Sequence, residues 1–456
     1  MRHKIAEETV LFVSVAKWIL LATIVGLIVG LSTTIFIKIL IWSSRFADHH
    51  PYYFLILPAA LIASTLIVKF LAPDARGHGT EKVIEAIHKH SGRIKVSVVP
   101  VKLIATIITI AAGGSVGKEG PCAQIGAGLT SMLASLLKFD DKDRKKLVIC
   151  GISAGFASVF GTPISGAIFG VEVLFAGSIL YDVLLPSFVA GITAHQVAFA
   201  LGVKYFYHPL NFVPVFSEIF FLKVIASGIF FGLCSGFLIE TIKYNEKLFA
   251  RLKDKFILQA FWGGIILIVL TFVFSKMYLG LGVDTIEAVL QGEKLPWYAF
   301  IVKSIFTAVT LSCGGSGGIV TPIFFVGAAA GCSFAMLLSL DIATFSAIGL
   351  VSLLAGAANT PISASIMAVE LFGPKLAPYA AVACVISFLM TGHRSVYPSQ
   401  VLATSKSSSI KVDLGKEIED IKAVYKPRNK SFIALTKKIA VDVKSLYKKI
   451  IKKAGD

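Results

Sequence analysis

One carboxylic acid stands inside a glycine-rich run of an otherwise apolar stretch. Residues 113–121 read Gly-Gly-Ser-Val-Gly-Lys-Glu-Gly-Pro, so Glu119 lies between Lys118 and Gly120. Glycine allows the backbone to approach a ligand closely, and proline is favoured in the first turn of a helix. The run therefore predicts a helix start, where free N–H groups carry roughly half a positive charge. Such a start favours the binding of a small anion.

A nucleotide phosphate loop is the first alternative, and the residue types disfavour it. That loop needs a glycine, four further residues and then Gly-Lys-Ser/Thr. Here Glu119 replaces the hydroxyl residue that would hold magnesium, and Ala112 occupies the position of the first glycine.

The second half of the chain repeats the first. Residues 314–322 read Gly-Gly-Ser-Gly-Gly-Ile-Val-Thr-Pro and align without gaps to residues 113–121. Thr-Pro-Ile-Ser recurs at 162–165 and at 360–363. Both matches have an offset of about 200 residues, which indicates an internal duplication.

The duplication brings both glycine runs to one region. If each copy crosses the membrane an odd number of times, the two copies are inverted relative to each other. Inverted repeats place a substrate site at their interface, near the bilayer midplane. Val320 stands where the first copy has Glu119, so only one copy supplies a carboxylate. A carboxylate inside a membrane is a functional hypothesis by default. It can also serve as the acidic partner of a helix N-terminus, and the two roles can coexist.

The elements that must position this site are membrane helices. The chain has 456 residues, of which 55% are hydrophobic and 16% charged. Apolar stretches of about 20 residues can cross a bilayer, and we expect spans at about 10–42, 53–72, 183–202, 218–240, 257–280 and 376–391. Shorter apolar segments broken by Gly and Pro, at 147–160 and 163–180, are typical of transporters. The predicted fold is an all-α polytopic membrane protein in which the broken helices of two inverted repeats converge on a midplane anion site.

The net charge of +17 comes largely from lysines near the C-terminus. Because a Lys/Arg excess marks cytoplasmic segments, we expect the basic tail at 406–456 to be cytoplasmic. The tail either contacts anionic lipid headgroups or is simply solvated, and nucleic acid is not an expected partner. The six cysteines and the histidines show no metal-ligand spacing, so we expect neither a metal nor a cofactor.

A second polar break is a further candidate for a ligand-facing helix start. Residues 77–81 read Gly-His-Gly-Thr-Glu, and Thr80 is a plausible N-cap for a helix that begins there. An ordinary loop between helices explains the same residues equally well.

The residues together resemble the CLC family of chloride channels and chloride/proton exchangers. The run at 113–121 resembles the family's Gly-Lys/Arg-Glu-Gly-Pro motif, and residues 317–322 resemble its Gly-x-Phe-x-Pro motif, with Val320 in place of phenylalanine. Residues 77–81 lie where the family has Gly-Ser-Gly-Ile-Pro, and Tyr397 stands where its pore tyrosine is expected. The match extends over roughly residues 12 to 405.

The resemblance implies a prokaryotic-type homodimer in the cell membrane with one pore per subunit. It implies a transmembrane domain at 1–405, with repeats at about 12–205 and 215–400, and no nucleotide-binding CBS modules after it. Glu119 would be the gating glutamate. The anion-binding residues would be His78, Gly79, Gly117, Lys118, Gly120, Ile319, Val320, Thr321 and Tyr397.

Two departures from the family pattern bear on mechanism. His78 replaces the central serine of the family, which leaves the selected anion open. Proton-coupled members often carry a second glutamate at the position of Val173, so this part of the chain resembles the channel branch. Glu172 and Glu370 occupy equivalent places in the two repeats, and we expect both to cap or pair at a helix end.

We therefore predict chloride transport through a pore gated by Glu119, in the manner of a voltage-gated chloride channel. A chloride/proton antiporter with an atypical internal proton path is the alternative. A fluoride/proton exchanger is less favoured, because the loops resemble the general chloride branch. A membrane enzyme is also less favoured, since no Asp or His is placed to assist Glu119 as an acid or base.

Overall fold

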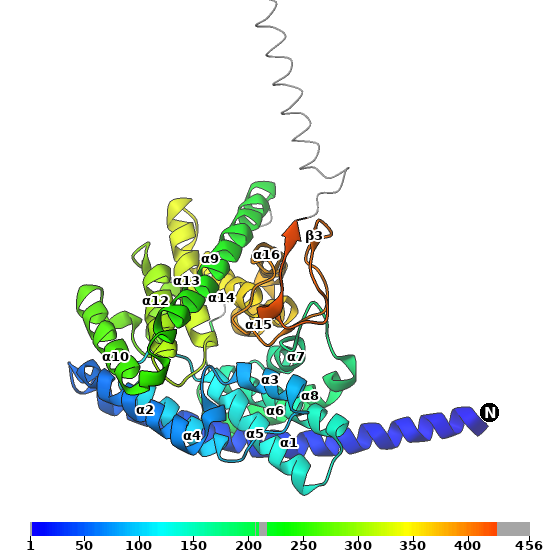
Figure 1. Ribbon diagram of the computed structural model, residues 1–456. Coiled ribbons are helices and arrows are strands. Elements are labelled where there is room, and N and C mark those ends of the chain that lie inside the picture. Colours follow the sequence, from blue (N-terminus) through cyan, green and yellow to red (C-terminus); the bar gives the residue numbers. More distant parts are fainter. Residues whose placement is uncertain (1, 206, 209–216, 426–456) are drawn as a thin grey trace, which may run out of the picture.

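The computed structural model describes residues 2–205, 207–208 and 217–425. Sixteen α-helices dominate these ranges (Figure 1). The first half contains α1 Arg2–Asp48, α2 Leu57–Leu71, α3 Thr80–Lys89, α4 Val98–Ala111, α5 Glu119–Leu136, α6 Asp141–Phe160, α7 Pro163–Glu172 and α8 Tyr181–Ala200. The second half contains α9 Glu218–Ala250, α10 Phe256–Val273, α11 Val283–Leu290, α12 Ala299–Ser312, α13 Val320–Leu337, α14 Ile342–Ala358, α15 Pro361–Phe372 and α16 Ala377–Met390.

Strands are short in the described part of the chain. β1, Phe175–Ala176, pairs in parallel with β2, Val401–Leu402. β3, Ile410–Lys411, pairs antiparallel with β4, Val424–Tyr425. The β1–β2 pair fastens the segment after α16 to the helical body, whereas β3 and β4 pair within that segment. The prediction of an all-α fold is confirmed. The predicted tail falls mostly at 426–456, outside the described residues.

The two halves use the same local signals to begin and end their helices. Asp140 and Asp341 each accept a hydrogen bond from the backbone N–H three residues on, at 2.8 and 2.7 Å, which caps α6 and α14. Both helices end at a residue in the left-handed region, Gly161 with φ 71° and Asn359 with φ 57°. The next helices, α7 and α15, both begin with proline.

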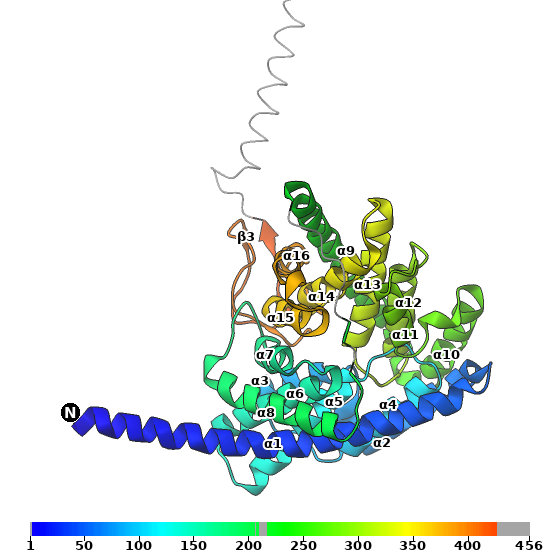
Figure 2. The ribbon, with the colours of Figure 1, turned by 180° about the vertical axis from the view of Figure 1, so that it is seen from behind.

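The halves lie side by side and interlock at their edges. Figures 1 and 2 show α1–α8 grouped on one side of the molecule and α9–α16 on the other. Contacts between α2 and α10, between α7 and α15, and between α5 and α13 cross the boundary. Helices of one repeat therefore form the wall against which the other repeat packs.

Most of the expected spans correspond to long apolar helices. α1, α8, α9, α10 and the helical run Tyr53–Leu71, which ends with α2, are long and apolar enough to cross a membrane. The span expected at 376–391 is wrong, because α16 has only 14 residues. α13, with 18 residues, is instead long and apolar enough, although it was not among the expected spans.

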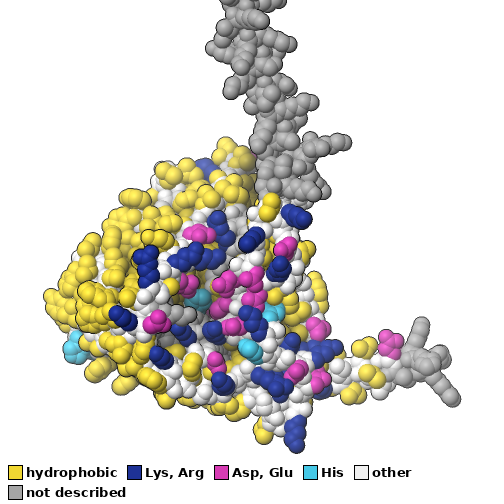
Figure 3. Space-filling view, viewed as in Figure 1, with side chains coloured by type: hydrophobic (Ala, Val, Ile, Leu, Met, Phe, Trp, Pro, Cys, Tyr) yellow, Lys and Arg dark blue, Asp and Glu magenta, His cyan; other side chains and the backbone are white. Residues whose placement is uncertain are grey.

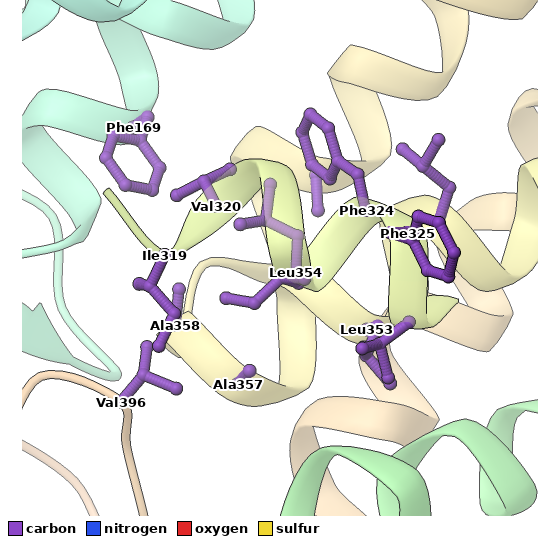
Figure 4. Close-up of a cluster of buried hydrophobic side chains, with 14 of the residues drawn as sticks. Phe169, Ile319, Val320, Phe324, Phe325, Leu353, Leu354, Ala357, Ala358 and Val396 are labelled. Atoms are coloured by element: carbon purple, nitrogen blue, oxygen red, sulfur yellow. The ribbon is translucent and has the colours of Figure 1, made fainter. Parts of the chain in front are cut away.

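The start of α13 presents its backbone, and not its side chains, to the boundary between the halves. Figure 4 shows the side chains of Ile319 and Val320 within an apolar cluster that includes Phe169, Ala358 and Val396. All five residues are buried. Since the side chains of Ile319 and Val320 are committed to packing, the backbone N–H groups of this start and the Thr321 hydroxyl remain to face a ligand.

Candidate functional site

Three helix starts meet at the boundary between the repeats. α3 begins after Gly79, which has φ 79° and is the N-cap. The expectation that Thr80 is the N-cap is wrong, because the loop needs a left-handed residue there and glycine adopts that conformation without strain. A methyl group on Gly79 would overlap the carbonyl of Gly120, and a methyl group on Gly120 would overlap the carbonyl of His78. Close approach of α3 to α5 therefore requires both glycines.

The two glycine runs are hydrogen-bonded directly to each other. Gly117 N–H donates to the carbonyl of Gly318 at 2.7 Å, and Gly318 N–H donates to the carbonyl of Gly117 at 2.6 Å. This reciprocal pair joins residues at equivalent places in the two repeats and holds the starts of α5 and α13 together. The predicted convergence of the two runs is present in the structure.

Glu119 bridges from one repeat to the other. Its Oε1 accepts a hydrogen bond from the backbone N–H of Val320 at 2.5 Å, and its Oε2 accepts one from Thr321 Oγ1 at 2.7 Å. The side chain is buried, with 1% exposed. Side chains on Gly117 or Gly318 would overlap this carboxylate, so both positions leave room for it. Glu119 thus occupies the donors at the start of the helix in the other repeat.

Two cavities are lined by residues of the segments that meet at this carboxylate. One, of about 520 Å³, is lined by residues that include His78, Gly315 and Ser316. The other, of about 180 Å³, is lined by residues that include Lys118 and Thr321. Glu119 lines neither cavity, and its hydrogen-bond partner Thr321 belongs to the wall of the second.

His78 and Tyr397 lie close together near the start of α3. Their ring centroids are 6.3 Å apart. Tyr397 is fully buried, and its hydroxyl lies beside the Thr80 side chain without a hydrogen bond of standard geometry. Nδ1 of His78 is buried and has no hydrogen-bond partner among the described residues. Buried polar atoms are normally paired, so these two unpaired atoms are candidates to contact a ligand.

Glu81 holds the segment that carries Tyr397. Its Oε1 accepts hydrogen bonds from the backbone N–H of Ser399 at 3.0 Å and from Ser399 Oγ at 2.5 Å. Glu81 is in the first turn of α3, where an acidic residue is favoured by the helix dipole. It therefore connects the helix start beside His78 to the loop on the far side of the site.

Lys118 and Val173 occupy different surroundings. Lys118 is the N-cap of α5 and lines the smaller cavity. It forms no ion pair within the described part of the chain.

Val173 is fully buried at the end of α7, where its carbonyl accepts a hydrogen bond from Gln400 at 2.8 Å. Val173 is held by structural contacts and has no hydrogen bond to Glu119.

Sequence reasoning missed a pair of buried lysines. Lys102 Nζ donates to the carbonyls of Gly77, at 2.5 Å, and Ala75. In the other repeat, Lys303 Nζ donates to the carbonyls of Gly280 and Tyr278, both at 3.0 Å. Both lysines are fully buried. The sequence could have indicated this pair. Each residue is the only lysine in a short apolar helix, and the two are separated by the offset of about 200 residues that relates the repeats.

The assembled site suits an anion better than a metal or a nucleotide. Its donors are a backbone N–H, a hydroxyl and helix starts, which attract an anion without a full positive charge that would trap it. Within the described residues, no group of three His, Cys, Asp or Glu side chains could hold a metal ion. A carboxylate bound to those donors competes with an anion for the same place.

Comparisons with known proteins identify the family. The family model for voltage-gated chloride channels matches residues 59–392. A chloride/fluoride channel protein of Pseudomonas syringae is 37% identical over 408 residues, covering 88% of this chain and 90% of that protein.

Solved structures agree with that match. A CLC-type fluoride/proton antiporter superposes with a TM-score of 0.81 at 28% identity, over 85% of this chain and 98% of the other. A slow cyanobacterial chloride/proton antiporter has the same fold, with a TM-score of 0.71 at 21% identity over 82% and 94% of the two chains. The all-helical inverted-repeat fold follows, and the chain belongs to the CLC family of voltage-gated chloride channels, whose members transport anions across membranes.

Proposed function

We propose that this protein moves halide anions through a pore in which Glu119 is the gate. The observation that carries the proposal is the position of the Glu119 carboxylate on the N–H of Val320 and the hydroxyl of Thr321. A halide needs such donors, and it reaches them only when the carboxylate leaves. Protonation weakens the hold of the carboxylate on these donors, because it removes the charge that strengthens the hydrogen bonds.

The remaining residues have supporting roles in this proposal. Backbone N–H groups around Gly117–Gly120 and Ile319–Thr321 stabilise the anion, and the Tyr397 hydroxyl donates to it. His78 and Gly79 form one boundary of the proposed anion site, and Lys118 raises the electrostatic potential near that site. The unpaired polar atoms of His78 and Tyr397 support their assignment.

We propose chloride as the anion and channel-like conduction, because Val173 stands where proton-coupled members often have a glutamate. Chloride/proton antiport through another route is the alternative. Fluoride transport is a second candidate, favoured by the relatives named a chloride/fluoride channel and a fluoride/proton antiporter. A membrane enzyme is not supported by the family, whose members are channels and transporters.

Reversal potentials in liposomes test these proposals. The full chain is reconstituted, and current or flux is measured with chloride or fluoride gradients, with and without a pH gradient. Passive chloride conduction predicts a reversal that follows the chloride gradient alone. A shift with pH would instead establish proton coupling, and a permeability ratio that favours fluoride would establish the second candidate. Absence of flux with either halide would overturn the proposal.

We also propose a homodimer with one pore per subunit, and a cytoplasmic C-terminus in a prokaryotic cell membrane. Subunit counting by single-molecule photobleaching in nanodiscs tests the assembly, since a homodimer gives two bleaching steps. Protease access to an epitope placed at the C-terminus of sealed, right-side-out vesicles tests the orientation. Protection from protease in sealed vesicles and cleavage after lysis are expected.

A further inference from the structure

A large polar cavity, separate from the anion site, opens beside α3. Its volume is about 1080 Å³, which is near the upper end for small-molecule sites. Its wall combines α3, the loop that follows it, the later part of α5 and the first turn of α6. Figure 3 shows charged side chains gathered over the middle of the face on which α3 lies in Figure 1. None of the proposed anion-binding residues lines this cavity.

The carboxylates in the cavity wall are already paired. Glu85 is 2.7 Å from Lys82, Asp141 is 3.1 Å from Arg93, and Asp74 is 3.1 Å from Lys95. The hydrogen bond from Arg93 lowers the pKa of Asp141, and the hydrogen bond from Lys82 lowers that of Glu85. Asp141 and Glu85 therefore remain ionised at neutral pH, and each of the three carboxylates has a cation of the wall as its partner.

Arg144 is the cation in the wall that lacks such a partner. Its side chain is nine-tenths buried, with 9% exposed, and its Nε has no hydrogen-bond partner in the described residues. No described carboxylate lies within ion-pair distance of it. Lys89 adds a further positive charge, although it also contacts Glu417 at 2.9 Å. Arg144 also contributes to lowering the pKa of Asp141, but it forms no ion pair with any described carboxylate, so its guanidinium group is available to an anion.

A second residue of the wall has a buried polar atom without a partner. Gln124 lines the wall and is 2% exposed, and its Nε2 donates to the carbonyl of Asp74 at 3.0 Å. Its Oε1 has no hydrogen-bond partner. This acceptor fits a ligand that carries a hydroxyl or amine as well as an anionic group. A bare halide would satisfy Arg144 and leave both Gln124 and most of the volume unused.

We propose that this cavity binds a phosphate-bearing ligand, with its phosphate on Arg144. The guanidinium group matches phosphate oxygens in a two-pronged geometry, and five cations against three carboxylates in the wall favour a multiply charged anion. The phosphate belongs either to a soluble small molecule or to a lipid headgroup. α3 and α5 line the cavity and also begin at the anion site, so an occupied cavity adjoins the pore.

Binding measurements on the full chain test the proposal. The protein in phosphatidylcholine nanodiscs is titrated with sodium pyrophosphate by calorimetry in 150 mM sodium chloride, where surface attraction is largely screened. Nanodiscs that contain phosphatidic acid are compared by native mass spectrometry for retained lipid. Saturable binding of pyrophosphate indicates a soluble ligand, and selective retention of phosphatidic acid indicates a headgroup; either supports the site.

Variants then locate the binding. Arg144→Gln is expected to weaken it about tenfold or more, as loss of a charge-assisted pair does. Lys89→Gln combined with Lys95→Gln changes only exposed side chains, so this double variant should fold even if Arg144→Gln does not. It is expected to weaken ligand binding several-fold. Arg251→Gln, an exposed change outside the cavity, is the matched control and should leave affinity unchanged. The proposal is overturned if neither pyrophosphate nor phosphatidic acid binds saturably. It is also overturned if the wild type and the cavity variants bind with equal affinity. Because the readout is binding, failure of the proposed transport function would not alter this result.

Discussion

Glu172 and Glu370 each cap a helix that belongs to the other repeat. The Glu172 carboxylate accepts hydrogen bonds from the backbone N–H groups of Ile362, at 3.1 Å, and Ser363, at 2.8 Å, at the start of α15. Glu370 accepts the equivalent bonds from Ile164 and Ser165 at the start of α7, at 2.9 and 2.8 Å. The prediction that both glutamates act at helix ends is confirmed. The exchange is reciprocal, as the duplication leads one to expect.

Loss of charge at Glu172 should cost stability and leave pH dependence intact. Glu172→Gln replaces a charged acceptor of two N–H bonds by a neutral one, so we expect the free energy of unfolding to fall by about 1–3 kcal/mol. Denaturant titration in mild detergent measures the change. Glu370→Gln is the matched variant and should cost less, because Glu370 is more exposed than Glu172. If Glu172→Gln abolished the pH dependence of flux without changing stability, Glu172 would be a proton relay and not a cap.

Replacement of Glu119 by glutamine should remove the pH dependence of transport. In the wild type, flux should rise as pH falls, because protonation weakens the hold of the carboxylate on Val320 and Thr321. Glu119→Gln mimics the protonated state, so flux should persist or rise and become flat with pH. Chloride efflux from liposomes at several pH values measures this, with the exposed Glu293→Gln as control. Complete loss of flux in a folded Glu119→Gln protein would contradict the gating role.

A methyl group on Gly117 should displace the gate selectively. The three atoms nearest to a Cβ on Gly117 all belong to the carboxyl group of Glu119, which can rotate away. Gly117→Ala should therefore retain the fold and show flux with weakened pH dependence. By contrast, Gly120→Ala would meet the backbone of His78, which cannot move aside, and should fail to fold.

A double variant provides the control for the change at Gly117. In a Glu119→Ala background the carboxylate is absent, so adding Gly117→Ala should change flux little further. Independent, additive effects of the two substitutions would show that Gly117 acts on something other than the carboxylate.

Tyr397→Phe should weaken anion binding without destabilising the protein. The hydroxyl of Tyr397 makes no hydrogen bond of standard geometry, so its removal leaves no protein group unpaired. We expect halide affinity, measured by calorimetry, to fall several-fold with an unchanged melting temperature. Tyr205→Phe is the comparison, because the Tyr205 hydroxyl donates to the carbonyl of Ser158 at 3.0 Å. That variant should lose about 1 kcal/mol of stability, and a similar loss for Tyr397→Phe would indicate a structural hydroxyl.

The sequence predicts the helix starts better than the contacts between them. Gly-Pro signals and the repeat place the starts of α5, α7, α13 and α15 correctly, because these residues act through local backbone geometry. The partner of Glu119 was not predictable in this way. Val320 donates through its backbone N–H. Every residue except proline has this group, so the residue type does not identify the donor.

Burial explains the other differences between expectation and structure. α13 was not among the expected spans, although its 18 residues are apolar enough to cross a membrane, and it lies buried among other helices. Lys102 and Lys303 are single lysines in apolar helices, and hydropathy alone does not show that they are buried. Each donates hydrogen bonds to backbone carbonyl groups. Thr80 has the residue type of an N-cap, but the left-handed turn at Gly79 moves the cap by one position.

The bonds between the repeats also determine which part of the protein can move during transport. Rocking one half against the other, a common way to alternate access, would break the Gly117–Gly318 pair and all four caps of Glu172 and Glu370 together. At roughly 0.5–1.5 kcal/mol for each bond, six bonds amount to several kcal/mol on every cycle. Rotation of one carboxylate breaks only two. In the proposed gating, the moving part is therefore a single side chain, and we expect the two halves to form a rigid frame around it.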